Sequence, residues 1–479
     1  MKNWIRRGIF CLAAVAVVVF VALLLRGPAS ESPAPERRPN IIVIVIESLR
    51  ADHCGCYGQK RATTPTLDGV AREGVTFSQC YASSSWTTPS VGSLMTGLSP
   101  IHHGLTSVTG KLPDGISTLS QELKRSGYYT LGVLCNSCAD GKMGFDRGFD
   151  VYDDFTILAD LDLDLFAAGG GAGRKEIHNV SVDRQTTDLA LRHLRKAPQD
   201  RPYFLFVFYF DPHFNYIPSG GYATMFDPDY RGKADGNVFG LPDRYTYPDP
   251  RDLEHVRALY DGEVRQTDDE IARLLGAMRE KGRLSDKDLL VITSDHGEEF
   301  CDHGGLKHGF TLYEEVVRVP LVMRWPGRLP AGKKVSALVE HRDLPGTLVA
   351  AAGGKAPEGM SRLDLVRLAR GDAAGGHDFV GMHTSLQDTV VGIRTSRWSV
   401  LVNTTNRKGE AFDLQADPRQ ARPLDPAKEA EPKRLLGLLE KWVGDEARLG
   451  EKLAGAQAGK GEKLSEEHIQ LLKALGYMR

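Results

Sequence analysis

The run Ile41-Ile-Val-Ile-Val-Ile46, followed by Glu47 and Ser48, decides the fold of this chain. Six consecutive β-branched apolar residues are typical of a strand that is buried on both faces, as in a parallel sheet covered by helices. Glu47 comes at the carboxyl end of this strand. In an open parallel α/β sheet, that end is where ligands bind. The stretch therefore predicts an α/β sheet with an acidic side chain at its ligand-binding edge.

Strand and helix patterns alternate along the rest of the chain. Apolar runs that favour strands lie at 129–134, 203–209 and 289–293. Amphipathic patterns that favour helices lie at 67–74, 116–127, 183–194 and 253–281. This alternation predicts a doubly wound, mostly parallel sheet flanked by helices. Weaker strand patterns at 390–394 and 398–403 and a charged, helical tail from Pro432 predict a small C-terminal α+β lobe.

The N-terminus predicts a membrane location. Lys2, Arg6 and Arg7 precede an uncharged apolar run at 8–25, which fits either a spanning helix or a long signal-peptide core. We favour an uncleaved single-pass anchor in the cell membrane, with the rest of the chain on the exported, periplasmic or extracellular side. The predicted divisions are an anchor at 1–26, a linker at 27–38, a main domain at 39–373, and a C-terminal subdomain with a helical tail at 374–479.

Charge and cysteine content exclude some classes of function. The chain has 60 Lys and Arg against 62 Asp and Glu, and no long basic run follows the anchor, so nucleic acid is not an expected partner. Of seven cysteines, Cys11 lies inside the predicted anchor. Cys135 and Cys138 have redox or zinc spacing, but no second pair with zinc spacing accompanies them. Disulfides or buried thiols are therefore the favoured interpretation.

Oxygen and nitrogen donors follow the predicted strand at 289–293. Asp295 and His296 come directly after it, and such a pair is a natural divalent-metal site, although surface Asp-His pairs are common. Thr87 and Thr88 precede Pro89, so one of them is expected to cap a helix, where a hydroxyl beside the positive helix end can attract a phosphate or sulfate. An ordinary capping threonine is the alternative, as is a simple helix-dipole contact for Glu47.

Histidines complete the pattern. Asp211 and His213 follow the strand at 203–209, and His303 and His308 lie in a glycine-rich loop after Asp295. Taken singly, each of these fits a turn with a structural histidine. Together, the clusters of Glu, Thr, Asp and His at strand ends predict a metal-dependent active site.

The chain resembles the sulfatase family of the alkaline phosphatase superfamily, and the resemblance covers nearly all of residues 39–479. The matching segments are Pro39–Asp52, Thr64–Asp68, Pro89–Ser90, Leu94–Gly97, Gly144–Gly148, Phe210–His213, Ser294–Gly297, His308–Gly309, Arg318–Pro326, Phe412–Pro418 and Leu475–Tyr477. The resemblance implies the alkaline phosphatase or sulfatase-like α/β fold and makes 39–373 the catalytic domain.

Departures from the family pattern bear on the reaction. Sulfatases carry Cys-x-Pro-x-Arg, whose Cys becomes the formylglycine nucleophile, but here Thr87 and Val91 stand at the Cys and Arg positions. Asn136 stands where a sulfate-binding Lys is expected, and His308 matches the Lys of the loop after the metal Asp. The first metal carboxylate is Glu47, where the family usually has Asp.

The resemblance therefore extends to a second group. Glu, Thr, Asp and His look like the metal set of the bacterial phosphoethanolamine and phosphoglycerol transferases, which are also membrane-anchored. Carried across, Glu47, Thr87, Asp295 and His296 would hold one divalent ion. Zn²⁺ or Mn²⁺ is favoured because imidazole is a softer donor than oxygen, with Ca²⁺ or Mg²⁺ as alternatives.

The expected chemistry is a two-step displacement on an anionic phosphate or sulfate ester of a lipid, glycan or small molecule. Thr87 is the expected nucleophile, and a covalent intermediate is released to water or an acceptor hydroxyl, as in a hydrolase or a transferase. His213 and His308 are expected to bind substrate oxygens and act as general acids, with Asn136 as a neutral oxygen contact. The alternatives are a sulfuric ester hydrolase without formylglycine and a noncatalytic binding protein that keeps the fold.

Overall fold

The structure is a computed structural model that describes residues 38–454, except 109, 155, 158–180 and 374. The predicted anchor at 1–26 and the predicted linker, apart from Arg38, lie outside the described residues. Among the residues that are described, no helix is both long and apolar enough to cross a bilayer.

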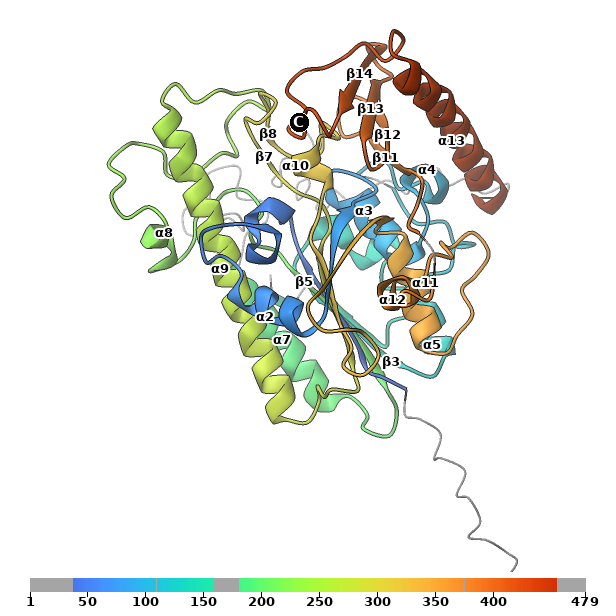
Figure 1. Ribbon diagram of the computed structural model, residues 1–479. Coiled ribbons are helices and arrows are strands. Elements are labelled where there is room, and N and C mark those ends of the chain that lie inside the picture. Colours follow the sequence, from blue (N-terminus) through green and yellow to red (C-terminus); the bar gives the residue numbers. More distant parts are fainter. Residues whose placement is uncertain (1–37, 109, 155, 158–180, 374, 455–479) are drawn as a thin grey trace, which may run out of the picture. The chain divides into compact units, whose positions relative to one another are not determined.

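A mixed eight-stranded sheet forms the centre of the fold, with the strand order β10-β2-β9-β6-β1-β5-β3-β4. Strand β1 lies in the interior and pairs in parallel with both β5 and β6, whereas β9 is antiparallel to its neighbours (Figure 1). The predicted mostly parallel sheet is confirmed. The strands are β1 (Ile41–Ile46), β2 (Val75–Tyr81), β3 (Tyr129–Leu134), β4 (Val151–Asp153), β5 (Tyr203–Tyr209), β6 (Leu289–Ser294), β9 (Leu321–Arg324) and β10 (Lys333–Glu340).

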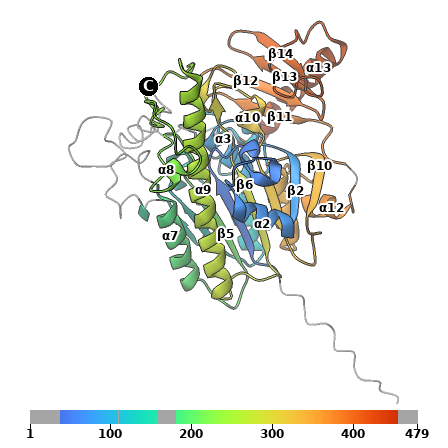
Figure 2. The ribbon, with the colours of Figure 1, turned by 60° about the vertical axis from the view of Figure 1, so that its left-hand side comes forward.

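Helices cover both faces of this sheet (Figures 1 and 2). One face packs against α2 (Pro65–Glu73), α7 (Asp183–Lys196) and the long α9 (Pro250–Glu280). The other packs against α3 (Thr87–Thr96), α5 (Leu119–Arg125), α11 (Asp343–Ala351) and α12 (Leu365–Arg370). Alternate residues of β1 enter the two cores, Ile44 on the α9 side and Val43 on the α3 side, which explains the unbroken apolar run.

Short elements connect these layers. Residues after β1 form the 3-10 turns η1 (Ala51–His53) and η2 (Gly55–Tyr57), and η3 (Ser137–Ala139) and η4 (Gly141–Met143) follow β3. After β6 the chain forms a hairpin of β7 (Glu299–Phe300) and β8 (Leu306–Lys307), then α10 (Glu314–Val317). The remaining short helices are α4 (Pro100–His103) and α8 (Tyr222–Met225).

The C-terminal lobe is an antiparallel meander covered by one helix. Its strands are β11 (Val380–Thr384), β12 (Val390–Arg394), β13 (Trp398–Asn403) and β14 (Lys408–Asp413), and α13 (Ala430–Ala454) packs Leu439 and Trp442 against them. The predicted small lobe is therefore confirmed. The predicted boundary between 373 and 374 precedes this sheet and stays a prediction.

Two sequence expectations change. The helix predicted at 116–127 is shorter, because Thr118 and Gln121 form a capping box that starts α5 at Leu119. The strand β2 was not predicted, since Thr76, Ser78 and Gln79 interrupt its apolar pattern. All six cysteines of the described part are free thiols, so the buried-thiol interpretation is the one that fits.

Gly297 allows the turn after β6 to pass close to α10. A Cβ at this position would lie 1.9 Å from the carbonyl oxygen of Glu315, and backbone at that distance cannot be displaced by a side-chain rotation. The Gly297 and Glu298 N–H groups also donate to the carbonyls of Val316 and Glu315. The glycine therefore fixes the course of the chain that carries Asp295 and His296.

Gly297→Ala is expected to destabilise the fold by about 1–3 kcal/mol, the usual cost of overpacking a close-packed interior. Gly276→Ala is the control, because it lies in α9 with no atom within 4 Å of an added Cβ. It should stabilise the protein by up to about 1 kcal/mol through helix propensity. Urea unfolding of both variants measures the difference, and equal stabilities would contradict this account of Gly297.

Candidate active site

Two strand ends and one helix start bring four of the predicted site residues together. Glu47 follows β1, Asp295 and His296 follow β6, and Thr87 is the first residue of α3; all four side chains have no exposed surface. Ile46 is in register with Ser294, so Glu47 and Asp295 are the next residues on neighbouring parallel strands. One ligand atom from each of Glu47, Asp295 and His296 lies within 4.8 Å of the others, an arrangement that could hold a metal ion.

Thr87 supplies the hydroxyl of this cluster. Its Oγ1 donates to Glu47 Oε1 at 3.0 Å and lies 3.3 Å from His296 Nε2. Thr88 is directed elsewhere, because its hydroxyl donates to the carbonyl of Cys138 at 2.8 Å. The expectation that Thr87 or Thr88 caps the helix is wrong, since Trp86 occupies the N-cap position and no side chain caps there. The Thr87 hydroxyl is oriented toward the cluster instead of toward its own helix.

Asp295 and His296 are held so that acceptor atoms face the cluster. Asp295 Oδ1 accepts the N–H groups of Ser48 and His296, whereas its buried Oδ2 has no hydrogen-bond partner among the described residues. His296 Nδ1 lies 2.8 Å from the carbonyl of Gly297, which can only accept, so Nδ1 carries the proton. In the neutral imidazole, Nε2 is then an acceptor 3.2 Å from Asp295 Oδ2. Asp295 Oδ2 and His296 Nε2 are thus two acceptor atoms that face each other without a proton between them. This arrangement fits a bound cation.

The carboxylates have the same electrostatic requirement. Burial, and then the charge of Asp295, raise the pKa of Glu47 well above its ordinary value. Burial likewise raises the pKa of Asp295. Two buried carboxylates are stable as anions only when a positive charge compensates them. The residues present therefore fit a bound divalent ion.

His213 and His308 line the same site. His213 Nε2 lies 3.8 Å from Glu47 Oε1, and its Nδ1 is 2.8 Å from the Phe214 carbonyl. The ring of His308 lies 4.3 Å from that of His296 and 5.1 Å from that of His213, between centroids. Lys307, its neighbour, turns away and donates to the carbonyls of Phe239 and Leu241. The structure thus places His308, and not Lys307, beside the cluster.

Asn136 contacts the cluster through Glu47. Its Nδ2 donates to Glu47 Oε2 at 2.5 Å, and its Oδ1 accepts the N–H of Cys138 at 2.7 Å. Both ends of the amide are therefore used in orienting the first carboxylate. The predicted substrate contact of Asn136 stays a prediction, and orientation of Glu47 is its visible role.

Sequence reasoning missed Glu298 and misplaced His303. Glu298 is fully buried, and its carboxylate lies 3.1 and 3.2 Å from His308 Nδ1. Burial raises the pKa of Glu298 to about 8. Its position directly after Asp295-His296-Gly297 was the available signal. His303 instead pairs with Glu315 at 2.6 Å and contacts the Gln420 carbonyl, outside the cluster.

Comparison with known proteins identifies the family of this chain. The sequence profile described as Sulfatase matches residues 39–354, and one described as N-sulphoglucosamine sulphohydrolase, C-terminal, matches residues 302–436. The first match covers more than half of the chain. The chain belongs to the sulfatase family.

Individual sulfatase relatives match over most of their length. An arylsulfatase of Clostridium perfringens is 26% identical over 443 residues, which cover 80% of this chain and 89% of that protein. The solved structure of a protein in complex with its substrate D-glucosamine-2-N,6-O-disulfate has a TM-score of 0.71 at 19% identity, covering 89% of this chain and 100% of that one.

The phosphonate monoester hydrolase of Agrobacterium radiobacter has a TM-score of 0.67 at 24% identity, covering 86% of this chain and 96% of that one. These likenesses confirm the α/β fold. The family match and the arylsulfatase relative support a hydrolase that acts on ester bonds.

Val91, which stands at the arginine position of the sulfatase pattern, also differs from it in its environment. It lies in α3 with 1% of its surface exposed and belongs to the apolar core on the α3 side of the sheet. An arginine at this position of the sulfatase pattern would need a polar partner that this core does not offer. The site is therefore built without that cation.

Glu47→Gln is expected to flatten the pH dependence of stability when metal is removed. A carboxyl whose pKa is raised by folding contributes its full stability below its ordinary value of 4.5 and loses it as pH rises toward the folded value. The chelated wild type should therefore lose stability as pH rises through the range above about 4.5, and the variant should lose less. Thermal unfolding of both proteins across this range measures the effect.

Glu358→Gln is the matched control, because Glu358 is exposed and lies outside the cluster. It should keep the wild-type pH dependence. Added Zn²⁺ or Mn²⁺ should raise the melting temperature of the wild type but not that of Glu47→Gln. An identical pH dependence in the wild type and Glu47→Gln would contradict the electrostatic account of the cluster.

Proposed function

We propose that this protein is a metal-dependent enzyme of phosphate esters that uses Thr87 as its nucleophile. The observation that carries the proposal is the Thr87 hydroxyl, which lies 3.0 Å from Glu47 and 3.3 Å from His296 within the buried cluster. A free hydroxyl is a poor nucleophile at neutral pH and needs activation. The neighbouring acceptors and the fit of the cluster to a cation both support that activation.

Glu47, Thr87, Asp295 and His296 are the residues that would hold the ion. A divalent metal bound there would lower the pKa of the hydroxyl and neutralise charge on the substrate. The mixed nitrogen and oxygen donors favour Zn²⁺ or Mn²⁺, with Ca²⁺ or Mg²⁺ as alternatives. Asn136 keeps Glu47 oriented by its 2.5 Å hydrogen bond.

The reaction proceeds in two displacements. Thr87 Oγ1 attacks phosphorus as its proton leaves along the existing hydrogen bond to Glu47, and the bond from phosphorus to the leaving oxygen breaks. His213, whose Nε2 lies 3.8 Å from Glu47 Oε1, gives a proton to that oxygen. Burial lowers the pKa of His308, so its neutral form orients a substrate oxygen while Glu298 holds its ring. Water, or an acceptor hydroxyl in a transferase, then attacks phosphorus as its proton passes to His213. The bond from phosphorus to Thr87 Oγ1 breaks, and the proton held by Glu47 returns to Thr87.

Phosphate esters are proposed ahead of sulfate esters. Thr87 cannot be converted to formylglycine by the maturation that acts on Cys or Ser, and Val91 and Asn136 replace two cations of the sulfatase pattern. Sulfate esters are the second candidate, because the family match and the arylsulfatase relative favour them. Lipids, glycans and small molecules are all compatible substrate classes.

Thr87→Ala should lower turnover of a chromogenic phosphodiester by about a thousandfold or more, as removal of a covalent nucleophile does elsewhere. Thr88→Ala is the control, because its hydroxyl is committed to the Cys138 carbonyl, and it should keep most of the activity. Mass spectrometry of quenched wild type should show a phosphoryl adduct on Thr87. An adduct on Thr88, or aryl sulfate turnover that survives Thr87→Ala, would reject the mechanism.

We also propose that residues 1–26 anchor the protein in the cell membrane with the catalytic domain exported. The support is the apolar run at 8–25 after Lys2, Arg6 and Arg7. Replacing three apolar residues of this run with Asp should move the protein from the membrane fraction to the soluble fraction. Three Asp substitutions at exposed positions of α13 are the control. Equal partitioning of both would contradict the anchor.

A further inference from the structure

A cavity separate from the metal cluster lies beside the loop of the β7–β8 hairpin, which contributes Asp302 and His303 to its lining. Its volume is about 830 Å³, which lies within the usual range for small-molecule sites. The main domain contributes η1, α10 and part of α9 to its walls, and the C-terminal lobe contributes the end of β12 and the loop after β14. Glu47, Thr87, Asp295 and His296 do not line it. The cavity is therefore a separate space at the junction of sheet domain and lobe.

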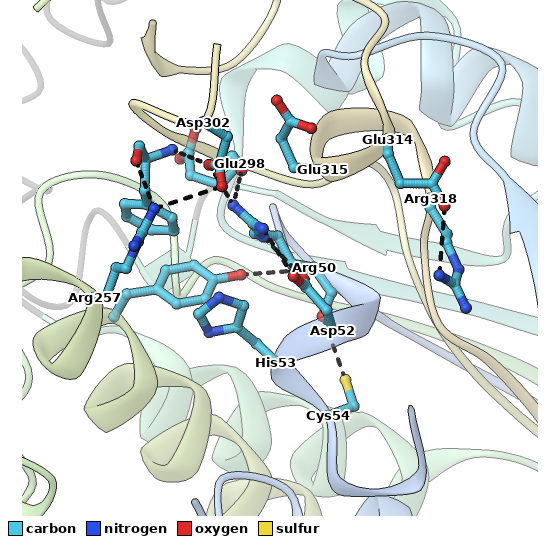
Figure 3. Close-up of polar contacts among 12 residues, drawn as sticks. Arg50, Asp52, His53, Cys54, Arg257, Glu298, Asp302, Glu314, Glu315 and Arg318 are labelled. Carbon is cyan, nitrogen blue, oxygen red and sulfur yellow. Dashed lines mark hydrogen bonds and ion pairs between the residues drawn. The ribbon is translucent and has the colours of Figure 1, made fainter. Parts of the chain in front are cut away.

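Guanidinium groups dominate its lining. Four carboxylates line the cavity, together with five arginines. The arginines are Arg50, Arg257, Arg318, Arg394 and Arg419. Figure 3 shows Arg50 in the middle of this group, with Arg257 on one side and Glu314 and Arg318 on the other. Burial lowers the pKa of His303, but the hydrogen bond and charge of Glu315 outweigh it and raise the pKa to about 9. The imidazolium adds a further positive charge to the wall.

Arg50 is held in place before any ligand arrives. Its Nε and Nη2 donate to Asp52 at 2.9 and 2.8 Å, and its Nη1 donates to Asp302 at 2.8 Å. Arg257 Nη2 is fixed by the Phe300 carbonyl at 2.8 Å. A guanidinium that is already oriented loses little side-chain entropy on binding.

Buried donors remain without acceptors on the lobe side. Arg394 is 6% exposed and pairs with Glu314 at 2.5 Å, yet its buried Nε has no hydrogen-bond partner among the described residues. Nε2 of Gln420 also lacks a hydrogen-bond partner among the described residues, although Gln420 itself does not line the cavity. Unsatisfied buried donors are rare and costly, and an added acceptor would relieve them.

We infer that this cavity binds the oxyanion group of a small polar ligand, such as a sulfated, phosphorylated or carboxylated sugar. Planar guanidinium groups match the oxygens of sulfate, phosphate and carboxylate. Few apolar side chains, Leu414 and Pro418 among them, line the space, which does not suit an acyl chain. The inference does not rest on the proposed reaction, because none of the residues proposed for it takes part.

Two successive hydrogen bonds connect the cavity to His308. Arg50 Nη1 donates to the Glu298 carbonyl at 3.2 Å, and the Glu298 carboxylate holds His308 Nδ1 at 3.1 Å. An occupant of the cavity that engages Arg50 therefore lies next to the segment that positions His308. This connects the second site to the hairpin of the active site.

Calorimetric titration of the full-length, metal-chelated chain tests the inference. The probes are glucose bearing a sulfate or a phosphate and glucuronate, with glucose as the uncharged control. Chelation leaves the carboxylates of the metal cluster uncompensated, so an anion is not expected to bind there. We expect at least one charged probe to bind with one site per chain, glucose not to bind, and rising salt to weaken binding.

Arg394→Gln and Arg419→Gln should each weaken binding about tenfold or more, the effect of losing a charge-assisted hydrogen bond. Arg419 is exposed, so its variant is expected to fold even if Arg394→Gln does not. Arg397→Gln is the control, because Arg397 is an exposed lobe arginine paired with Asp413 outside the cavity. Arg397→Gln and Asp295→Asn should both keep binding. Absence of binding by every charged probe, unchanged binding in Arg419→Gln, or loss in Asp295→Asn would overturn the inference.

Discussion

The meeting of two buried carboxylates at one sheet edge is the constraint on which the site depends. Glu47 and Asp295 follow adjacent parallel strands that end in register, so their side chains are brought together with no exposed surface. Burial and mutual repulsion make this arrangement unfavourable for two anions. Hydrogen bonds from Thr87, Asn136 and the backbone N–H groups of Ser48 and His296 offset part of that cost. A bound cation would offset the remaining repulsion between the two carboxylates.

The order of the strands brings further residues to the same edge of the sheet. Because β1 lies between β5 and β6, the segments that follow all three strands reach the same edge, and His213 joins the cluster from the β5 side. The β7–β8 hairpin then returns His308 to the site, and Gly297 permits its close passage along α10. The loop of the same hairpin contributes Asp302 and His303 to the lining of the arginine-lined cavity. One short segment after β6 thus forms a wall of both sites.

The sequence predicted the sheet and most site residues because their signals are local. The apolar run 41–46 forms the predicted buried strand, and Asp295 and His296 belong to a group of side chains that could hold a metal ion. For Thr87 and His303, the local sequence pattern predicts the wrong environment. A threonine before a helix is usually a cap, but a carboxylate forty positions away takes its hydrogen bond. His303 has the same loop context as His308, yet Glu315 and Gln420 hold it elsewhere.

The sequence by itself determined the α/β architecture, the gathering of strand-end residues in one cluster, and the threonine that stands at the position of the sulfatase cysteine. Periodicity and strand-end chemistry suffice for these, since they depend on neighbours along the chain. Tertiary structure alone decided which threonine faces the cluster, that Glu298 holds His308, and that arginines from the main domain and the lobe surround a second cavity. Those features depend on contacts between residues far apart in sequence, and only strand register and packing set such contacts.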